Sequence, residues 1–103
     1  TATVKALLTD LVPTGNYSID VVADQLNVHR RTLQRRLADA GVRYSDLLDS
    51  CRASMAVAYL EESRLPIVNL AHMLGYSDQS AFNHAFRRWH GVSPKAWTER
   101  NKL

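Results

Sequence analysis

Two stretches of the sequence combine cationic and amide side chains, and neither stretch contains an acidic residue. The first runs from His29 to Arg36 and holds four arginines and one glutamine; the second runs from Gln79 to Lys95 and mixes three cations with amides and hydroxyls. A guanidinium donates two parallel hydrogen bonds to guanine, a side-chain amide pairs in the same way with adenine, and arginine and lysine also bind phosphate. Because the whole chain carries a net charge of only +3, its remainder is slightly acidic. The two stretches therefore indicate a polyanionic partner that is contacted at two places.

Helices have to position these side chains. Apolar residues recur at helical spacing along most of the chain, and there is no sustained alternation typical of strands. The spacing predicts an all-α fold of seven helices. They are expected near residues 2–12, from Ile19 to Leu26, around Leu33 to Ala40, near residues 45–62, from Ile67 to Leu74, from Phe82 to Trp89, and around Ala96 and Trp97. The apolar face of the long fourth helix is expected to contain Leu47, Leu48, Cys51, Met55, Ala58 and Tyr59.

Glycine, serine and proline mark the ends of the predicted helices. Gly41 and Gly91 each follow an amphipathic stretch, as expected of a helix that ends in the left-handed conformation. Ser18 is a good N-cap, and Ser93-Pro94 has the order favoured at a helix start. Pro66 stands just ahead of the fifth apolar run, where it is expected to open a helix.

The sequence also contains a weak internal repeat. Apolar positions of the second predicted helix recur 48 residues later in the fifth, those of the third recur 49 residues later in the sixth, and Gly41 recurs as Gly91. Each copy is a helix, a tight turn and a second helix. We therefore expect one domain, residues 1–103, made of two helix-turn-helix units at about 18–41 and 67–91. The central helix would be roughly 27 Å long. A rigid spacer of this length, together with the width of the flanking units, could hold two reading heads near the spacing of about 34 Å between successive major grooves on one side of DNA.

The second helix of each copy carries polar residues opposite its apolar face. For the first copy, the predicted base-reading residues are Arg31, Gln34 and Arg35. For the second copy they are Gln79, Ser80, Asn83 and His84. The predicted phosphate contacts are Arg30, Arg36, Arg87, Arg88 and Lys95. The alternative is that these faces are merely solvated; such faces usually mix charges of both signs, and these do not.

Several classes of protein are not favoured by the sequence. With 103 residues there is room for one modest core, and no apolar run approaches the length of about 20 residues that crosses a bilayer. A single cysteine, Cys51, excludes an internal disulfide, and we expect it to be inert core in a cytoplasmic protein.

The four histidines lack metal-ligand spacing, so no metal or other cofactor is expected, and His72 is expected to be a hydrogen-bonded residue at the edge of the core. No catalytic constellation or phosphate-binding loop is present, so an enzyme is not expected. Because the first residue is Thr1, we expect a piece of a longer chain.

The second half of the chain resembles the DNA-binding domain of the AraC/XylS family of bacterial transcription regulators. The resemblance rests on the pattern Ile67-x2-Leu70-Ala71-x2-Leu74-Gly75-Tyr76-x3-Ser80-x-Phe82-x3-Phe86-Arg87-Arg88-x2-Gly91-Val92-Ser93-Pro94, and on Ser18-x3-Val22-Ala23-x2-Leu26 and Arg31-Thr32-Leu33-Gln34-Arg35 in the first half. It covers about residues 18–100. The sequence departs from the family pattern at His29, where a capping serine is usual, and at His84, where an arginine is usual.

The resemblance implies two recognition helices in successive major grooves of promoter DNA. It also implies contact with RNA polymerase and an N-terminal sensor or dimerisation domain in the parent chain. It places the base-reading positions on the same seven residues that the helical faces indicate. The alternative function is a protein-interaction module that docks on RNA polymerase or another regulator, with only minor DNA contact.

Overall fold

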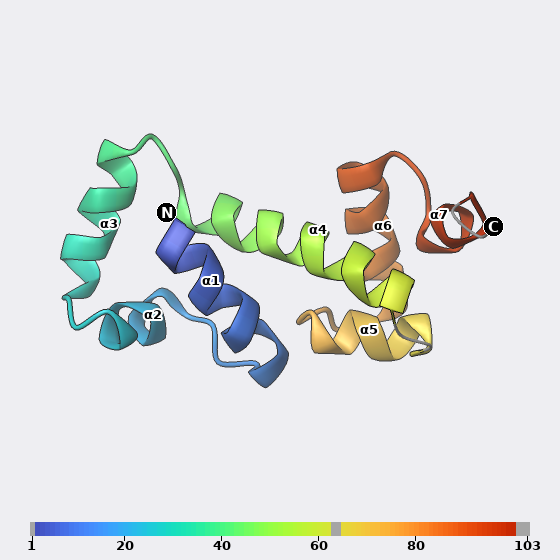
Figure 1. Cartoon of the computed structure of the whole chain (residues 1–103), viewed down its shortest axis with the longest axis horizontal. Helices are drawn as coiled ribbons and strands as arrows, with labels where there is room; N and C mark the ends of the chain where they lie inside the picture. The colour runs from blue at the N-terminus through green and yellow to red at the C-terminus, as the bar shows by residue number, and fades with distance from the viewer. Residues whose placement is uncertain (1, 63–64, 101–103) are drawn as a thin grey trace. The chain divides into compact units, whose positions relative to one another are not determined.

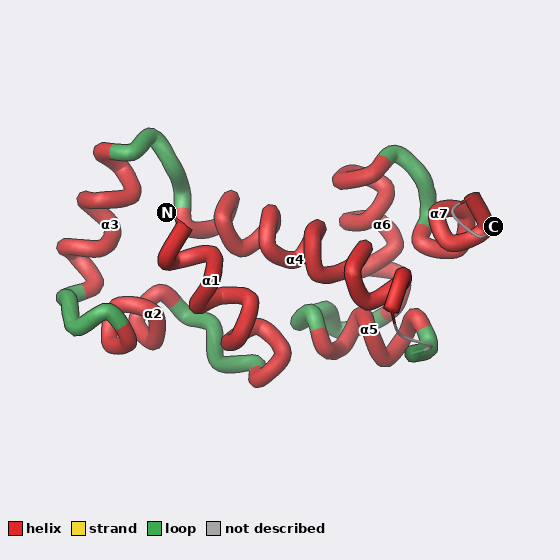
Figure 2. The backbone as a smooth tube through the Cα atoms, in the orientation of Figure 1, coloured by secondary structure: helices red, strands yellow, loops and turns green. Residues whose placement is uncertain are grey.

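The structure, a computed structural model, describes residues 2–62 and 65–100, and all regular structure in these ranges is helical (Figure 2). The predicted all-α fold of seven helices is therefore confirmed for this part of the chain. The chain divides into two compact units, unit 1 (Thr1–Cys51) and unit 2 (Arg52–Leu103). Along the sequence (Figure 1) the elements are α1 (Ala2–Leu11), the 3₁₀ turn η1 (Val12–Thr14), α2 (Ile19–Gln25), α3 (Arg30–Asp39), α4 (Tyr44–Glu62), α5 (Ile67–Met73), α6 (Gln79–His90) and α7 (Pro94–Arg100).

In unit 1, α2 and α3 form the first helix-turn-helix pair, α1 packs against α2, and η1 packs against α1. The hydroxyl of Ser18 accepts a hydrogen bond from the N–H of Val21 at 3.3 Å, which confirms the predicted N-cap of α2. Gly41 follows α3 with a φ of 74°, also as predicted. The core of unit 1 contains Val4, Leu8, Val12, Val22, Ala23, Leu33, Leu37, Leu47 and Cys51.

Two side chains of α4 tie this helix to the rest of unit 1. The hydroxyl of Tyr44 donates a hydrogen bond to the carbonyl oxygen of Tyr17, and the thiol of Cys51 donates to the carbonyl oxygen of Lys5 at 3.6 Å. Burial, together with smaller contributions from the neighbouring Cys51 and Tyr17, raises the pKa of Tyr44 to about 12. Burial also raises the pKa of the Cys51 thiol. The thiol is thus buried and protonated at neutral pH, as expected of an inert core cysteine.

In unit 2, α5 and α6 form the second helix-turn-helix pair around a cluster of rings. Phe82 and Phe86 are fully buried, with their ring centroids 5.8 Å apart. Trp97 of α7 packs edge-on against Phe86, at a centroid distance of 6.4 Å. The buried residues of unit 2 are Met55, Ala56, Leu70, Ala71, Leu74, Phe82, Ala85, Phe86 and Pro94.

The two helix-turn-helix pairs share one turn geometry, so the sequence repeat is also a structural repeat. In each turn the central residue, Asn27 or Gly75, lies in the left-handed region with a φ of 57° or 95°. Glycine and asparagine are the residues that tolerate this conformation best. Three backbone hydrogen bonds hold each turn, all between 3.0 and 3.1 Å. In unit 1 the N–H groups of Leu26, Asn27 and Val28 donate to the carbonyl oxygens of Val22, Asp24 and Ala23. In unit 2 the N–H groups of Leu74, Gly75 and Tyr76 donate to those of Leu70, His72 and Ala71, which are the equivalent positions.

The helix starts agree with the predictions to within a few residues. The hydroxyl of Ser93 accepts from the N–H of Ala96 at 3.1 Å, which confirms the predicted cap of α7. Helix α6 begins at Gln79 and so includes Gln79 and Ser80, as its predicted polar face requires; Oδ1 of Asp78 caps it by accepting from the N–H of Ala81 at 2.8 Å. Gly91 ends this helix with a φ of 80°, as predicted.

Two expectations about the core are wrong. Ala58 is exposed, and its neighbour Ala56 is fully buried instead. The sequence pattern predicts one continuous apolar face along α4. In the structure, however, residues up to Cys51 belong to unit 1 and residues from Arg52 belong to unit 2. The buried face therefore changes along the helix. His72 is exposed rather than at the edge of the core, because α5 faces its core through Leu70 and Ala71.

Candidate nucleic-acid interface

Helix α3 exposes every polar side chain that the sequence predicts to contact DNA. Leu33 and Leu37 are buried against unit 1, while Arg31, Gln34, Arg35 and Arg36 are all exposed. A helix that enters a groove needs this division, because one side must pack on the protein and the other must remain open to bases. The structure brings the three predicted base-reading residues of unit 1 together on one short helix. Their contacts with bases stay a prediction.

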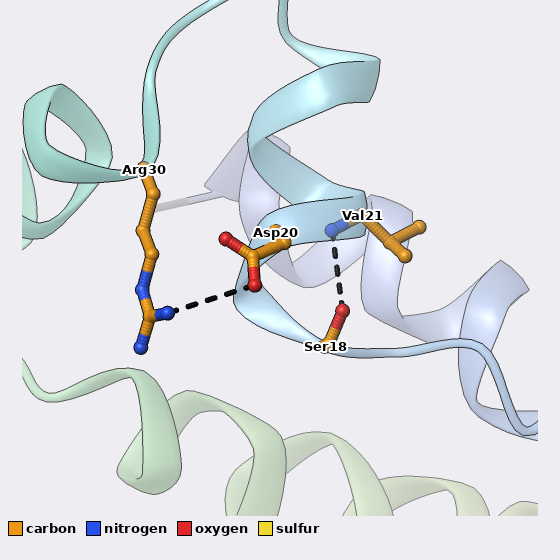
Figure 3. Close-up of polar contacts among 4 residues, drawn as sticks. All are labelled: Ser18, Asp20, Val21 and Arg30. Atoms are coloured by element: carbon orange, nitrogen blue, oxygen red, sulfur yellow. Dashed lines mark hydrogen bonds and ion pairs between the residues drawn. The ribbon is translucent and has the colours of Figure 1, made fainter.

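Arg30, at the start of α3, lies beside an acid of the preceding helix (Figure 3). Its Nη1 atom is 3.6 Å from Oδ2 of Asp20, and the two side chains are 56% and 63% exposed. An ion pair this exposed contributes little to stability. Arg30 can therefore exchange Asp20 for a DNA phosphate at small cost. Ser18, drawn in the same figure, caps the helix from which Asp20 projects.

The start of α3 differs from the starts of α2 and α6. His29 occupies the N-cap position in an extended conformation, with φ −74° and ψ 150°, and its side chain makes no capping hydrogen bond. The family pattern has a capping serine at this position, and the histidine that replaces it here does not cap the helix. The first N–H groups of a helix that lacks a side-chain cap need other acceptors, such as water or an anion.

Helix α6 has the same two-sided arrangement with a different chemistry. Its buried side carries Phe82, Ala85 and Phe86. The exposed residues Gln79, Ser80, His84 and Arg87 lie around the remaining surface, and no acid occurs between Gln79 and His90. Where α3 offers mainly guanidinium groups, α6 offers an amide, a hydroxyl and an imidazole. The two helices therefore suit different base sequences.

Asn83 is less available than the other predicted base-reading residues. The side chain is half-buried, and its Oδ1 atom is enclosed without a hydrogen-bond partner. Pairing with adenine through two bonds needs both polar atoms of the amide. Turning the amide over exchanges oxygen and nitrogen but still encloses one of them. In this conformation Asn83 offers at most one polar atom to a base, whereas Gln79 is exposed.

The predicted phosphate-binding cations of unit 2 have unequal surroundings. Arg87 and Arg88 are exposed in the last turn of α6, and the guanidinium of Arg88 lies 6.0 Å from the ring centroid of Trp89. Lys95 is exposed on α7, where it lines a cavity of about 470 Å³ together with Glu61 and Glu99. These two carboxylates line the same cavity as Lys95 and would compete with a phosphate for its charge. Arg87 and Arg88 are therefore the better placed cations.

One residue with a structural role at this interface carried no signal in the sequence. The half-buried Arg52 of α4 donates a hydrogen bond from Nε to the carbonyl oxygen of Leu74 at 2.7 Å, and its guanidinium lies 5.2 Å from the ring centroid of Tyr76. Both partners belong to the turn between α5 and α6. A lone arginine in a long helix resembles any solvated cation, so only the fold reveals this contact.

Across residues 2–62 and 65–100, no group of three histidine, cysteine, aspartate or glutamate side chains could hold a metal ion. Among the helices described, none is both long enough and apolar enough to span a bilayer.

Two helix-turn-helix pairs, each with an exposed polar face on its second helix, define a class of DNA-binding proteins. Comparison with known proteins agrees: the helix-turn-helix domain family matches residues 22–100. The chain belongs to this family, in its AraC/XylS type. The predicted family is therefore confirmed, and so is the predicted class of function, a sequence-specific DNA-binding module of a bacterial transcription regulator.

Several characterised relatives are regulators of transcription by name. The chain is 47% identical over 87 residues to the HTH-type transcriptional regulator VirS of Mycobacterium tuberculosis, covering 84% of this chain and 26% of VirS. It is 40% identical over 87 residues to the regulator VqsM of Pseudomonas aeruginosa, covering 84% and 27% of the two chains. The chain thus spans about a quarter of the length of these curated relatives.

Solved structures show the same fold. The transcriptional regulator CdpR of Pseudomonas aeruginosa matches with a TM-score of 0.70 and 48% identity, over 80% of this chain and 26% of that one. A DNA-binding transcriptional dual regulator of Escherichia coli matches with a TM-score of 0.87 over 97% and 95% of the two chains. At 24% identity, the second likeness shows the fold alone.

Proposed function

We propose that the chain binds double-stranded promoter DNA by placing α3 and α6 in successive major grooves, as one DNA-binding domain. The observation that carries the proposal is the repeated arrangement of the two units. Each presents, on the second helix of a helix-turn-helix pair, an exposed polar face opposite a buried apolar one.

The residues that read bases are then those that the sequence predicts. In unit 1, Arg31 and Arg35 favour guanine and Gln34 favours adenine. In unit 2, Gln79 favours adenine, Ser80 offers a hydroxyl and His84 an imidazole, each able to donate and to accept, and Asn83 contributes through one polar atom only. Phosphates would be held by Arg30, Arg36, Arg87 and Arg88, with a smaller share for Lys95.

Selection from random DNA tests this proposal. The expected result is a bipartite site with two conserved half-sites whose centres lie about 10 base pairs apart. A footprint on the selected DNA should then exceed about 12 base pairs, since two grooves are engaged. Selection of a single half-site, or a footprint confined to one groove, would contradict docking by both units.

The parent protein is proposed to be a cytoplasmic regulator that contacts RNA polymerase and carries an N-terminal sensor or dimerisation domain. The limited coverage of the relatives supports the presence of further domains in the parent, because about three quarters of each curated relative lies outside the match. No catalytic activity is proposed for this chain.

One observation also favours the protein-interaction function that the sequence left open. Leu65 and Val68, near the start of α5, are 42% and 38% exposed and are the exposed large hydrophobic residues among those described. Leu65 also lines the cavity between α4, α5 and α7, together with Leu60 and Ile67. Exposed apolar groups beside a cavity are typical of protein contacts. We propose this surface as the contact with RNA polymerase.

A gel-shift experiment with purified RNA polymerase tests this contact. Val68→Ser should leave DNA binding unchanged and weaken formation of the ternary complex with polymerase on the selected DNA. The matched control is Val21→Ser in unit 1, a half-buried valine on a different element. A ternary complex that forms equally well with Val68→Ser would refute the assignment of this surface.

A further inference from the structure

The turn between α5 and α6 is held on both sides by one side chain. Arg52 donates a hydrogen bond from Nε to the carbonyl oxygen of Leu74, at 2.7 Å. Leu74 is the C-cap residue of α5, where a carbonyl oxygen lacks a partner within the helix. A charged donor makes a bond about twice as strong as a neutral one. The C-terminal end of α5 is therefore fixed to α4 through Arg52.

The guanidinium of Arg52 also contacts the residue on the other side of the turn. It lies over the ring of Tyr76, 5.2 Å from the centroid, within the range of a cation–π interaction. Leu74 and Tyr76 flank Gly75, whose φ of 95° makes this the sharpest part of the turn. A single arginine thus spans the point at which the chain changes direction between the two helices.

Tyr76 continues the chain of contacts into the recognition helix. Its ring packs against Phe82 at a centroid distance of 5.9 Å and against Trp89 at 6.2 Å. Phe82 lies near the start of α6 and Trp89 near its end, so contact with both fixes the rotation and tilt of the helix. The exposed face with Gln79, Ser80 and His84 is presented by this same helix.

The equivalent turn of unit 1 has the same backbone bonds but lacks the ring. Val28 stands at the position that corresponds to Tyr76, and a valine side chain cannot receive a cation in this way. A device that acts through Tyr76 is therefore specific to unit 2.

We propose that Arg52 is a positioning residue for the recognition helix of unit 2. It would set the placement of α6 against α5 through Leu74 and Tyr76, and so determine which side chains of α6 reach the bases. This inference rests on the proposed function, because it requires that α6 reads DNA. Arg52 is half-buried and bonded to the protein, so it would act on base preference without binding DNA itself.

The test compares Arg52→Met with the unchanged chain on single-base variants of the selected DNA site. In the unchanged chain, each wrong base in either half-site should weaken binding by roughly 5- to 100-fold. In Arg52→Met the penalties at the half-site of α6 should fall to about twofold or less. The penalties at the half-site of α3 should remain as they were. Arg43→Met is the matched control, an exposed arginine of unit 1 that should leave the second half-site unaffected.

Salt dependence and thermal unfolding separate positioning from other roles. If Arg52 bound a phosphate directly, the slope of log K against log salt would become shallower by about 1 in Arg52→Met. The proposal expects no change in that slope. If Arg52 only stabilised the fold, losses would follow the melting temperature and affect both half-sites equally. Either result would overturn the proposal, as would an unchanged base profile at the second half-site.

Two further variants keep the test decisive if Arg52→Met does not fold. Arg52→Lys retains the charge but not the planar group, so it should lose part of the discrimination at the second half-site. Tyr76→Leu removes the ring but keeps apolar packing. Because both residues act in one chain of contacts, adding Tyr76→Leu to Arg52→Lys should cause little further loss of discrimination at the second half-site. Failure of the proposed function is visible separately, since the unchanged chain would then show no preference at the second half-site at all.

Discussion

At the scale of single residues, arginines on one helix are expected to perform different tasks. Arg35 lies opposite Leu33 on α3, where a guanidinium can pair with guanine, whereas Arg36 lies nearer the side of the helix. Arg35→Ala should cost roughly 1–3 kcal/mol of binding free energy and relax the preference at one base pair. Arg36→Ala should weaken binding to all sequences about equally. Titration of each variant against the selected site and against random DNA distinguishes the two; an equal loss on both DNAs for Arg35→Ala would show a phosphate contact instead.

Asn83 provides a second prediction at this scale, because its enclosed Oδ1 atom has no partner. An unsatisfied buried polar atom costs about 1–3 kcal/mol. Asn83→Leu should therefore raise the free energy of unfolding by about 1 kcal/mol, measured by urea denaturation. Asn69→Leu is the control: Asn69 is exposed on α5, so it should show only the small gain in helix propensity. Equal gains for the two variants would show that the Asn83 oxygen carries no penalty.

At the scale of elements, the left-handed turn residue of unit 1 can be tested directly. Asn27 has a φ of 57°, in the region where a Cβ is crowded by the following carbonyl. Asn27→Ala should destabilise the chain by about 1 kcal/mol. Asn27→Gly should cost less, since Gly75 performs the same role in the other unit. Urea denaturation of both variants measures the difference, and a larger cost for the glycine variant would contradict this reading of the turn.

The attachment of α4 in unit 1 predicts a dependence of stability on alkaline pH. The pKa of Tyr44 is raised to about 12 by burial, from the ordinary value of 10. Because the folded state holds this proton more tightly than the unfolded state, the stabilisation is complete below pH 10 and is lost as pH rises from 10 to 12. Tyr44→Phe should lack this component of the pH profile. Urea denaturation between pH 8 and 11.5 measures it, with Tyr59→Phe as the control for loss of one phenol.

The elements also show how far sequence reasoning extends. Apolar spacing placed all seven helices, and Ser18, Ser93 and the two helix-ending glycines were identified because caps depend on local residue type. The cap of α6 at Asp78 was not identified from the sequence. Ala58 and His72 were assigned wrongly because burial within a helix depends on which neighbours cover it. That information is not local to the sequence.

The site could be predicted in outline and not in detail. The exposed faces of α3 and α6 follow from periodicity alone, since the buried leucines and phenylalanines fix which side remains outside. The enclosure of the Asn83 oxygen, the ion pair of Arg30 with Asp20 and the two contacts of Arg52 were not predictable. Each depends on side chains brought together by folding.

At the scale of the whole molecule, DNA affinity should depend steeply on salt. The proposed interface neutralises phosphates with five cations, and base-facing arginines add to the local charge. If about six phosphates are neutralised, log K should fall with log salt at a slope near −5. Binding titrations between 50 and 300 mM salt measure this slope. A slope near −2 would indicate that only one unit is engaged, and the footprint would then be short as well.

The separate cores of the two units have a consequence for how such a regulator changes over time. Leu33 and Leu37 hold one recognition helix in place, while Phe82 and Phe86 hold the other. A substitution on the exposed face of either helix therefore leaves the folding of its counterpart untouched. The base sequence of one half-site and the residues of the helix that binds it can therefore change together during evolution, while the other half-site and its helix stay the same.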